Sequence, residues 1–148
     1  MAAHLWQPLM MPGGFAEVWH QDLHSLTELV HLRSRLRAEL TGNAAVVDPT
    51  REHWSERMVL VVDELASNAL RHGAPPASAT LSRSGNEWMI AVSDSAGDTP
   101  PRPAEGRDPG LGGFGLYLVA DLAQRHGWCA AGERKVLWAL LTADDPAS

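Results

Sequence analysis

Glu64 and Asn68 are the side chains of this 148-residue chain whose types and spacing are best suited to chemistry. Four residues apart on a helix, they lie about 40° apart around its axis and therefore project from the same edge. A carboxylate and an amide at the border of an apolar helix face are costly to place there unless they have partners. Together the two groups can hold a hydrated cation and orient a nucleophile.

A further carboxylate and a glycine-rich turn extend this pattern. Asp94 follows a predicted strand, which places its carboxylate at the carboxyl end of that strand. The run 110–116 (GLGGFGL) leads directly into a predicted helix. Free N–H groups at the start of a helix, at the positive end of its dipole, suit phosphate oxygens. The turn is not a Walker loop, because no Gly-Lys-Ser/Thr follows it.

The helix that presents Glu64 is predicted over residues 48–72. Either Asp48 or Thr50 can cap its start, and Gly73 is the expected stop after its last turn. Its apolar face is indicated by the helical spacing of Met58, Val62, Leu65 and Ala69. The pattern therefore predicts a helix with one buried face and a polar edge that carries the two candidate groups.

The remaining elements are two helices, over 24–40 and 114–124, and five strands, over 15–22, 78–83, 87–93, 128–131 and 135–141. The second and third strands form a hairpin, and the nearly all-apolar last strand is typical of the middle of a sheet. Glycine and proline between residues 94 and 113 exclude a regular element there. We predict an α/β two-layer sandwich, with three helices on one face of a mixed, mostly antiparallel sheet.

One domain is expected over residues 15–142, after a flexible lead-in over 1–14 that docks through Trp6, and before a tail over 143–148. A net charge of −6 argues against a nucleic-acid surface. No apolar run approaches the roughly 20 residues that span a membrane, and the start of the chain does not read as a signal peptide. The single cysteine fits a reducing compartment, so we expect a cytoplasmic protein.

The three features together resemble a known family. Glu64-x-x-x-Asn68-Ala69 on a helix, Asp94 after a strand and the run 113–116 (GFGL) opening a helix are similar to the GHKL ATPases, which have the Bergerat nucleotide-binding fold. Within them the chain looks most like the stand-alone anti-sigma-factor serine/threonine kinases of bacteria. The resemblance covers residues 16–141, and the last strand matches as well.

The resemblance implies roles for the matching residues. Asn68 would be the side-chain ligand to Mg²⁺, and Glu64 would orient and deprotonate the attacking oxygen. Asp94 would accept a hydrogen bond from the adenine amino group of ATP. The other residues assigned to the nucleotide are Ala69, Arg71, Gly97, Gly112, Gly113, Phe114, Gly115 and Leu116, under a mobile lid over 98–112. An exposed arginine at a helix end is an equally good interpretation of Arg71.

The chain also departs from the family pattern. The adenine box, usually Asp-x-Gly-x-Gly, is 94–98 (DSAGD), and Leu111 stands where some kinases carry an arginine. Arg134-Lys135 replaces the Gly-Thr that often precedes the last strand. These departures leave binding of ATP with weak or absent transfer as an alternative.

Three functions therefore remain open. The first is an ATP- and Mg²⁺-dependent protein serine/threonine kinase that regulates bacterial transcription by partner switching, with a sigma factor and its antagonist protein as partners. The second is a nucleotide-binding protein-interaction module that transfers weakly or not at all. The third is the detached ATPase domain of a histidine kinase. A homodimer through an exposed strand edge is also implied by the resemblance.

Overall fold

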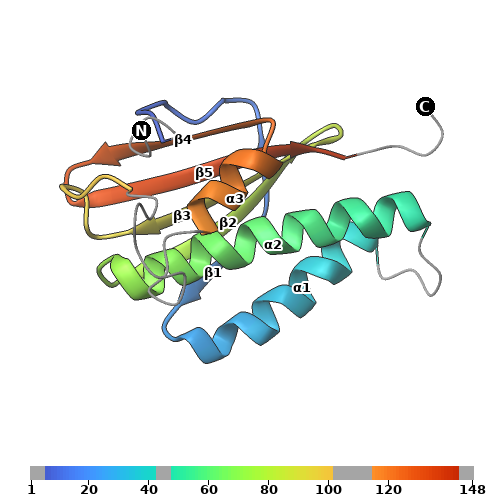
Figure 1. Cartoon of the computed structure of the whole chain (residues 1–148), viewed down its shortest axis with the longest axis horizontal. Coiled ribbons are helices and arrows are strands. Elements are labelled where there is room, and N and C mark those ends of the chain that lie inside the picture. The colour runs from blue at the N-terminus through green and yellow to red at the C-terminus, as the bar shows by residue number, and fades with distance from the viewer. Residues whose placement is uncertain (1–5, 43–47, 102–114, 144–148) are drawn as a thin grey trace.

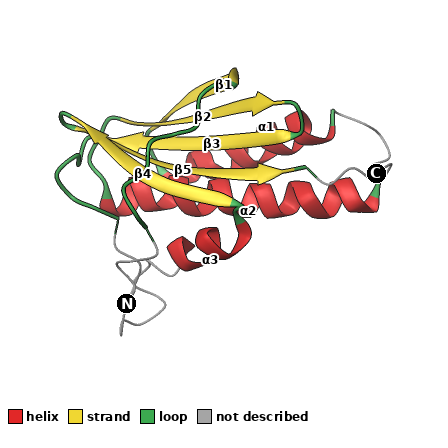
Figure 2. Cartoon of the chain, turned by 90° about the horizontal axis from the view of Figure 1, so that it is seen from above, coloured by secondary structure: helices red, strands yellow, loops and turns green. Residues whose placement is uncertain are grey.

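The computed structural model describes residues 6–42, 48–101 and 115–143, which form two layers (Figures 1 and 2). Figure 2 shows the sheet as one layer and the helices together on one of its faces. The elements are β1 (Ala16–Leu23), a 3₁₀ helix η2 (Leu26–Glu28), α1 (Leu29–Thr41), α2 (Pro49–His72), β2 (Ala77–Ser84), β3 (Glu87–Asp94), α3 (Gly115–Leu122), β4 (Arg125–Ala131) and β5 (Arg134–Thr142).

The five strands lie in the order β1-β2-β3-β5-β4, and each neighbouring pair is antiparallel. Outside these strands, an isolated bridge joins Pro8 to Trp128 of β4 in parallel orientation. The predicted fold class is confirmed, including the hairpin of β2 and β3 and the interior position of β5. Among the described residues none of the helices combines the length and the apolar character that crossing a membrane requires.

The longest helix, α2, is organised as its sequence predicts. Asp48 caps its start, where the carboxylate accepts a hydrogen bond of 2.8 Å from the Thr50 N–H, and Pro49 is the first helical residue. The Gly73 N–H closes the last turn on the Ala69 carbonyl at 3.0 Å. The apolar stripe is buried against the sheet: Met58, Val62, Leu65 and Ala69 are at most 5% exposed. Burial of Met58, Val62 and Leu65 contributes roughly 1.5–3 kcal/mol for each side chain.

Both faces of β5 are buried, which explains its nearly continuous apolar sequence. Leu137 and Ala139 belong to the main core beneath the helices, whereas Trp138 and Leu140 belong to a smaller cluster with Met89. Because successive side chains of a strand alternate between faces, this second cluster lies on the sheet face opposite the helices.

Residues 6–9, here called the N-terminal strap, join β4 to α3. The Leu9 N–H donates to the Trp128 carbonyl at 2.9 Å, and the Trp138 indole donates to the Leu9 carbonyl at 2.8 Å. Trp6 is 3% exposed, donates its indole N–H to the Leu116 carbonyl at 3.1 Å and meets the His126 ring edge-on. The predicted docking of the lead-in through Trp6 is thus present.

The start of α1, the end of α3 and the start of β4, which was predicted at residue 128, differ from the prediction by two residues or more. The Glu28 carboxylate accepts hydrogen bonds from the backbone N–H groups of His24 and Ser25, so that a 3₁₀ turn precedes α1 and the α-helix begins only at Leu29. The third helix ends at Leu122, since β4 begins at Arg125 to pair with β5. Local side-chain capping therefore decides the start of α1, and strand pairing decides the other two boundaries.

Candidate functional site

Glu64 and Asn68 lie half-buried on the C-terminal half of α2, at the border of its apolar stripe as predicted. Ala69, the next residue, is buried at 5% exposure. Within the described part of the chain, no hydrogen bond engages the Asn68 amide. This edge of α2 therefore offers one carboxylate and one uncommitted amide.

The start of α3 lies directly against Glu64. A Cβ atom built on Gly115 would overlap the Glu64 Oε2 atom, so a glycine is required for this approach. The following residue, Leu116, is 1% exposed and its carbonyl is held by Trp6 of the strap. The predicted base and the amino end of the predicted phosphate-binding helix are thus neighbours.

The surroundings of Glu64 make it a stronger proton acceptor than an exposed carboxylate. Burial raises the pKa of Glu64 above its ordinary value of 4.5, and the charge of Asp63 raises it further. The Arg71 guanidinium lowers the same pKa, so the side chain of Arg71 lies within electrostatic reach of Glu64. Asp63 itself forms an ion pair with Arg33 of α1. Arg71 is exposed at the end of α2, and its assignment to the nucleotide stays a prediction.

Asp94 lies at the other end of this region, buried at 2% exposure where β3 ends. Its Oδ1 atom accepts a hydrogen bond of 2.7 Å from the Ala96 N–H, and its Oδ2 atom lies 3.7 Å from the Lys135 ammonium of β5. A Cβ atom on Gly73 would lie 2.5 Å from the Asp94 carboxyl carbon. The end of α2 therefore closes directly over Asp94.

The two contacts, Glu64 with Gly115 and Asp94 with Gly73, occupy the last turns of one helix. At 1.5 Å per residue, residue 64 and the end of α2 at residue 72 are about 12 Å apart along the helix axis. Asn68 lies between them on α2. The structure thus brings these predicted site residues to a single region of the molecule.

Gly97 has a different neighbourhood. Its N–H donates to the Glu133 carbonyl at 2.9 Å, and an added Cβ would lie 2.7 Å from the Gly132 carbonyl oxygen. Gly97 thus packs on the turn between β4 and β5, which is a structural reason for this glycine. Gly112, Gly113, Phe114, Leu111 and the lid from residue 102 onward lie outside the described residues, so their predicted roles stay predictions.

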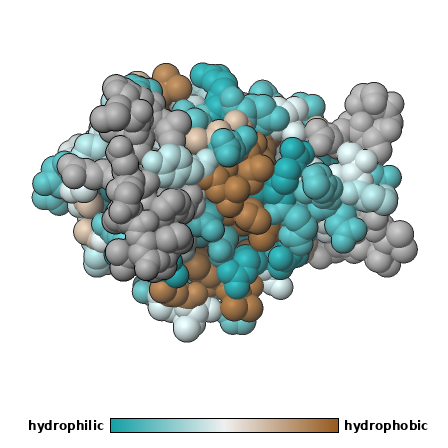
Figure 3. Space-filling view, in the orientation of Figure 1, coloured by the Kyte–Doolittle hydropathy of each residue, from teal (hydrophilic) through white to brown (hydrophobic). Residues whose placement is uncertain are grey.

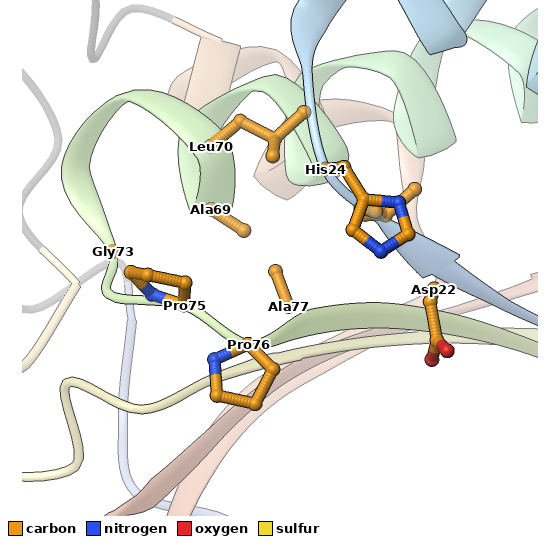
Figure 4. Close-up of a pocket in the computed structure, with 9 residues that line it drawn as sticks. Asp22, His24, Ala69, Leu70, Gly73, Pro75, Pro76 and Ala77 are labelled. Atoms are coloured by element: carbon orange, nitrogen blue, oxygen red, sulfur yellow. The ribbon is translucent and has the colours of Figure 1, made fainter.

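A pocket of about 590 Å³ opens at the C-terminal end of α2 (Figure 4). Its described lining comes from the end of β1, the last turn of α2 and the segment before β2: Asp22, Leu23, His24, Ala69, Leu70, Gly73, Pro75, Pro76 and Ala77. Ala69 is the one predicted site residue among them. The pocket therefore adjoins the predicted nucleotide site and does not coincide with it.

Apolar surface surrounds the contact between α2 and α3. Figure 3 shows, on the face seen in Figure 1, apolar side chains gathered over these two helices and a second apolar area near the start of α1. Leu60 of α2 is 42% exposed, and Leu26 and Val30 near the start of α1 are 43% and 58% exposed. This face thus combines the polar edge of α2 with exposed apolar residues.

Two residues of the site did not follow from the sequence in these roles. Gly73 was expected only as a helix stop, yet it also makes room for Asp94. Lys135 was noted only as a departure from the family pattern, yet it is 3% exposed and pairs with Asp94. The alternation of side chains along β5 could have indicated the position of Lys135, because it places Lys135 on the same face of the sheet as Leu137 and Ala139.

The family model described as histidine kinase-like ATPase domain matches residues 26–140. No curated protein matches the chain. The histidine kinase AdeS of Acinetobacter baumannii is structurally similar, with 14% sequence identity and a TM-score of 0.46, over 86% of this chain and 68% of that chain.

Proposed function

Because the chain belongs to the histidine kinase-like ATPase domain family, we propose that it binds ATP with Mg²⁺ along the C-terminal half of α2 and phosphorylates a serine or threonine of a partner protein. The family match supports the binding of ATP. Asp94 lies at the adenine end of the proposed site and Gly115 at its phosphate end. Asn68 and Ala69 lie between these ends on α2.

The observation that carries this proposal is the contact of Glu64 with Gly115. Glu64 accepts the proton of the attacking hydroxyl while that oxygen forms a bond to the γ-phosphorus. The bond between the γ-phosphorus and the bridging oxygen breaks at the same time, which releases ADP. The raised pKa of Glu64 supports this role, because a proton acceptor works best when its pKa approaches the working pH.

Asn68 is the residue that holds Mg²⁺ in this proposal. Its amide is half-buried and has no hydrogen-bond partner among the described residues, which leaves its oxygen available to a metal ion. Mg²⁺ binds few protein oxygens and keeps several waters, and when bound it neutralises charge on the triphosphate. Arg71, which lies within electrostatic reach of Glu64, adds positive charge to the same region.

The partners follow from the resemblance to anti-sigma-factor kinases. We propose a sigma factor and its phosphorylatable antagonist as partners, in bacterial partner switching in the cytoplasm. A homodimer is proposed through β1, which is an edge strand of the sheet. The apolar surface around α2 and α3 is compatible with a protein acceptor that must bring its hydroxyl to Glu64.

A second candidate is a nucleotide-binding interaction module without transfer. It is favoured by the environment of Asp94, whose two oxygens already face the Ala96 N–H and the Lys135 ammonium. The detached ATPase domain of a histidine kinase is a third candidate, which the description of the family fits equally well. The three differ in the acceptor of the phosphoryl group: a serine or threonine, none, or a histidine.

Incubation with γ-labelled ATP and candidate antagonist proteins tests the proposal. We expect an acid-stable label on the antagonist, and its loss with Glu64→Gln while ATP binding persists. The matched control is Glu56→Gln, which removes an exposed carboxylate of the same helix that pairs with Arg37. An acid-labile label would indicate a histidine acceptor, and tight ATP binding without label transfer to any candidate would favour the module.

A further inference from the structure

Arg134, the first residue of β5, joins three separate segments through one guanidinium group. Its Nη1 atom donates to the Pro76 carbonyl at 2.6 Å and to the Ser95 hydroxyl at 2.8 Å. Its Nη2 atom donates to the Ser93 hydroxyl at 2.6 Å. The two serines flank Asp94, the last residue of β3, and Pro76 belongs to the link between α2 and β2. Arg134 therefore ties this link to the end of β3.

Arg134 leaves β5 on the face of the sheet opposite the helices. Trp138, which shares this side of β5 by alternation, belongs to the small hydrophobic cluster on that face. Asp94 lies instead on the helix-facing side, where Gly73 approaches it. A ligand that reaches Asp94 from the side of the helices is therefore separated from Arg134 by the sheet. Arg134 can act on such a ligand only through the residues that it positions.

The link between α2 and β2, residues 73–76, lies directly beside the end of β3. A Cβ atom on Gly73 would lie 2.5 Å from the Asp94 carboxyl carbon. The Ala74 carbonyl accepts a hydrogen bond of 2.7 Å from the Ser95 N–H. The guanidinium and this backbone bond thus hold the link at two points. The position of Gly73 over Asp94 depends on both.

We propose that Arg134 is a positioning residue that fixes Asp94 relative to the last turn of α2 and thereby sets the affinity for the nucleotide. The inference rests on the proposed function, because it requires the nucleotide to reach Asp94. It goes beyond that function because it assigns a role to a residue on the opposite face of the sheet. A guanidinium suits the role, since its planar set of N–H donors serves three acceptors in fixed directions.

Equilibrium binding of ATP and of inorganic triphosphate to Arg134→Met tests the inference. We expect ATP to bind about tenfold more weakly, as for lost hydrogen bonds to a charged group. Triphosphate should bind as before, since it occupies only the phosphate end of the proposed site, at Gly115. The matched control is Arg83→Met. Arg83 also donates to a carbonyl, that of Gly85 at 2.7 Å, but at the opposite end of β2 and β3. This control should leave the binding of both ligands unchanged.

A second pair of substitutions leaves the guanidinium in place and removes two of its acceptors. Ser93→Ala combined with Ser95→Ala should also weaken ATP binding, and adding Arg134→Met should weaken it little further, because the groups act as one network. The serine variant keeps the test decisive if Arg134→Met unfolds. Arg134→Lys should restore only part of the affinity, since one ammonium cannot replace both terminal nitrogens.

Melting curves of every variant set the temperature at which all of them are folded for these measurements. The positioning role is wrong if ATP affinity is unchanged, if ATP and triphosphate weaken by the same factor, or if the losses in the arginine and serine variants simply add. If the unmodified protein binds no ATP, the proposed function itself fails, which is a different outcome from any of these three.

Discussion

The carboxylate of Glu64 lies against the backbone of Gly115, so that α2 and α3 meet at a proton acceptor and a helix start. Any side chain at position 115 would push the carboxylate away. The position of α3 in this contact is also fixed by the strap, because the Trp6 indole N–H donates to the Leu116 carbonyl. Three segments far apart in the sequence therefore define the position of one carboxylate.

The first prediction concerns the pH dependence of phosphoryl transfer. Only ionised Glu64 accepts a proton, so the rate should rise as pH rises through its raised pKa. Asp63→Asn removes a charge that raises this pKa and should move the rise to lower pH. Arg71→Gln removes a charge that lowers it and should move the rise to higher pH. Initial rates between pH 4.5 and 8 measure both shifts, and equal profiles for the two variants would contradict the assignment of Glu64.

The same pKa shift has a consequence for stability. Folded Glu64 binds a proton more tightly than unfolded Glu64, so its contribution to stability is present below pH 4.5 and is lost as pH rises through the raised pKa. The stability of Glu64→Gln relative to the unchanged protein should therefore increase over that range. Urea denaturation at several pH values measures the difference. A difference that does not change with pH would mean that burial does not disfavour the charge.

The proposed role of Asn68 as a metal ligand is tested by the Mg²⁺ dependence of ATP binding. Asn68→Ala should weaken the Mg²⁺-dependent part of ATP binding by at least about tenfold, because a metal ligand is lost. Calorimetric titrations with ATP in Mg²⁺ and in EDTA separate the two parts. Ser67→Ala is the control, since its hydroxyl bonds the Glu64 carbonyl within the helix and should not affect Mg²⁺. If ATP binding by Asn68→Ala kept its full Mg²⁺ dependence, the metal ion would have to be bound by other residues.

Gly73→Ala tests the approach of α2 to Asp94. The new Cβ would lie 2.5 Å from the carboxyl carbon and 2.6 Å from the Ala69 carbonyl oxygen, so Asp94 must move. Overpacking of this kind costs about 1–3 kcal/mol, which lowers the melting temperature by roughly 2–10 °C. ATP binding should weaken by about tenfold as Asp94 is displaced. Gly13→Ala is the control, because no atom lies near its added Cβ.

Trp6→Phe tests the strap. The change removes the indole N–H that bonds Leu116 and keeps most of the buried ring. We expect a loss of about 1 kcal/mol, or roughly 2–4 °C in melting temperature, and faster amide exchange in α3. Met10→Ala, at a residue that is 80% exposed, should change neither quantity. Unaltered exchange in α3 would show that the strap does not hold that helix.

Local patterns were sufficient to predict α2, its cap at Asp48 and the edge that carries Glu64 and Asn68. They were sufficient because spacing, capping and the glycine stop act within a few residues of one another. The same holds for the hairpin of β2 and β3, whose partners are adjacent in sequence. Asp94 was found because it follows an apolar strand directly.

Contacts between distant residues could not be predicted in this way. The ammonium of Lys135 reaches Asp94 only through the register of β3 against β5, which 40 residues of intervening chain leave open. The partner of Trp6 is 110 residues away, and the strap has no periodic pattern that would indicate a strand. Sequence spacing therefore identified most groups of the site but not the contacts that constrain them.

The strap also gives the sheet two unlike borders. At the β4 edge of the sheet, the bridge from Pro8 to Trp128 occupies one hydrogen-bonding position. The nitrogen of Pro8 carries no hydrogen that it could donate to a further strand. In the described part of the chain, β1 has no strand on its outer side. Strand addition of β1 to the β1 of a second copy would join two copies edge to edge and would leave neither β1 edge open. Such a protein can pair but cannot polymerise into a fibre by this route.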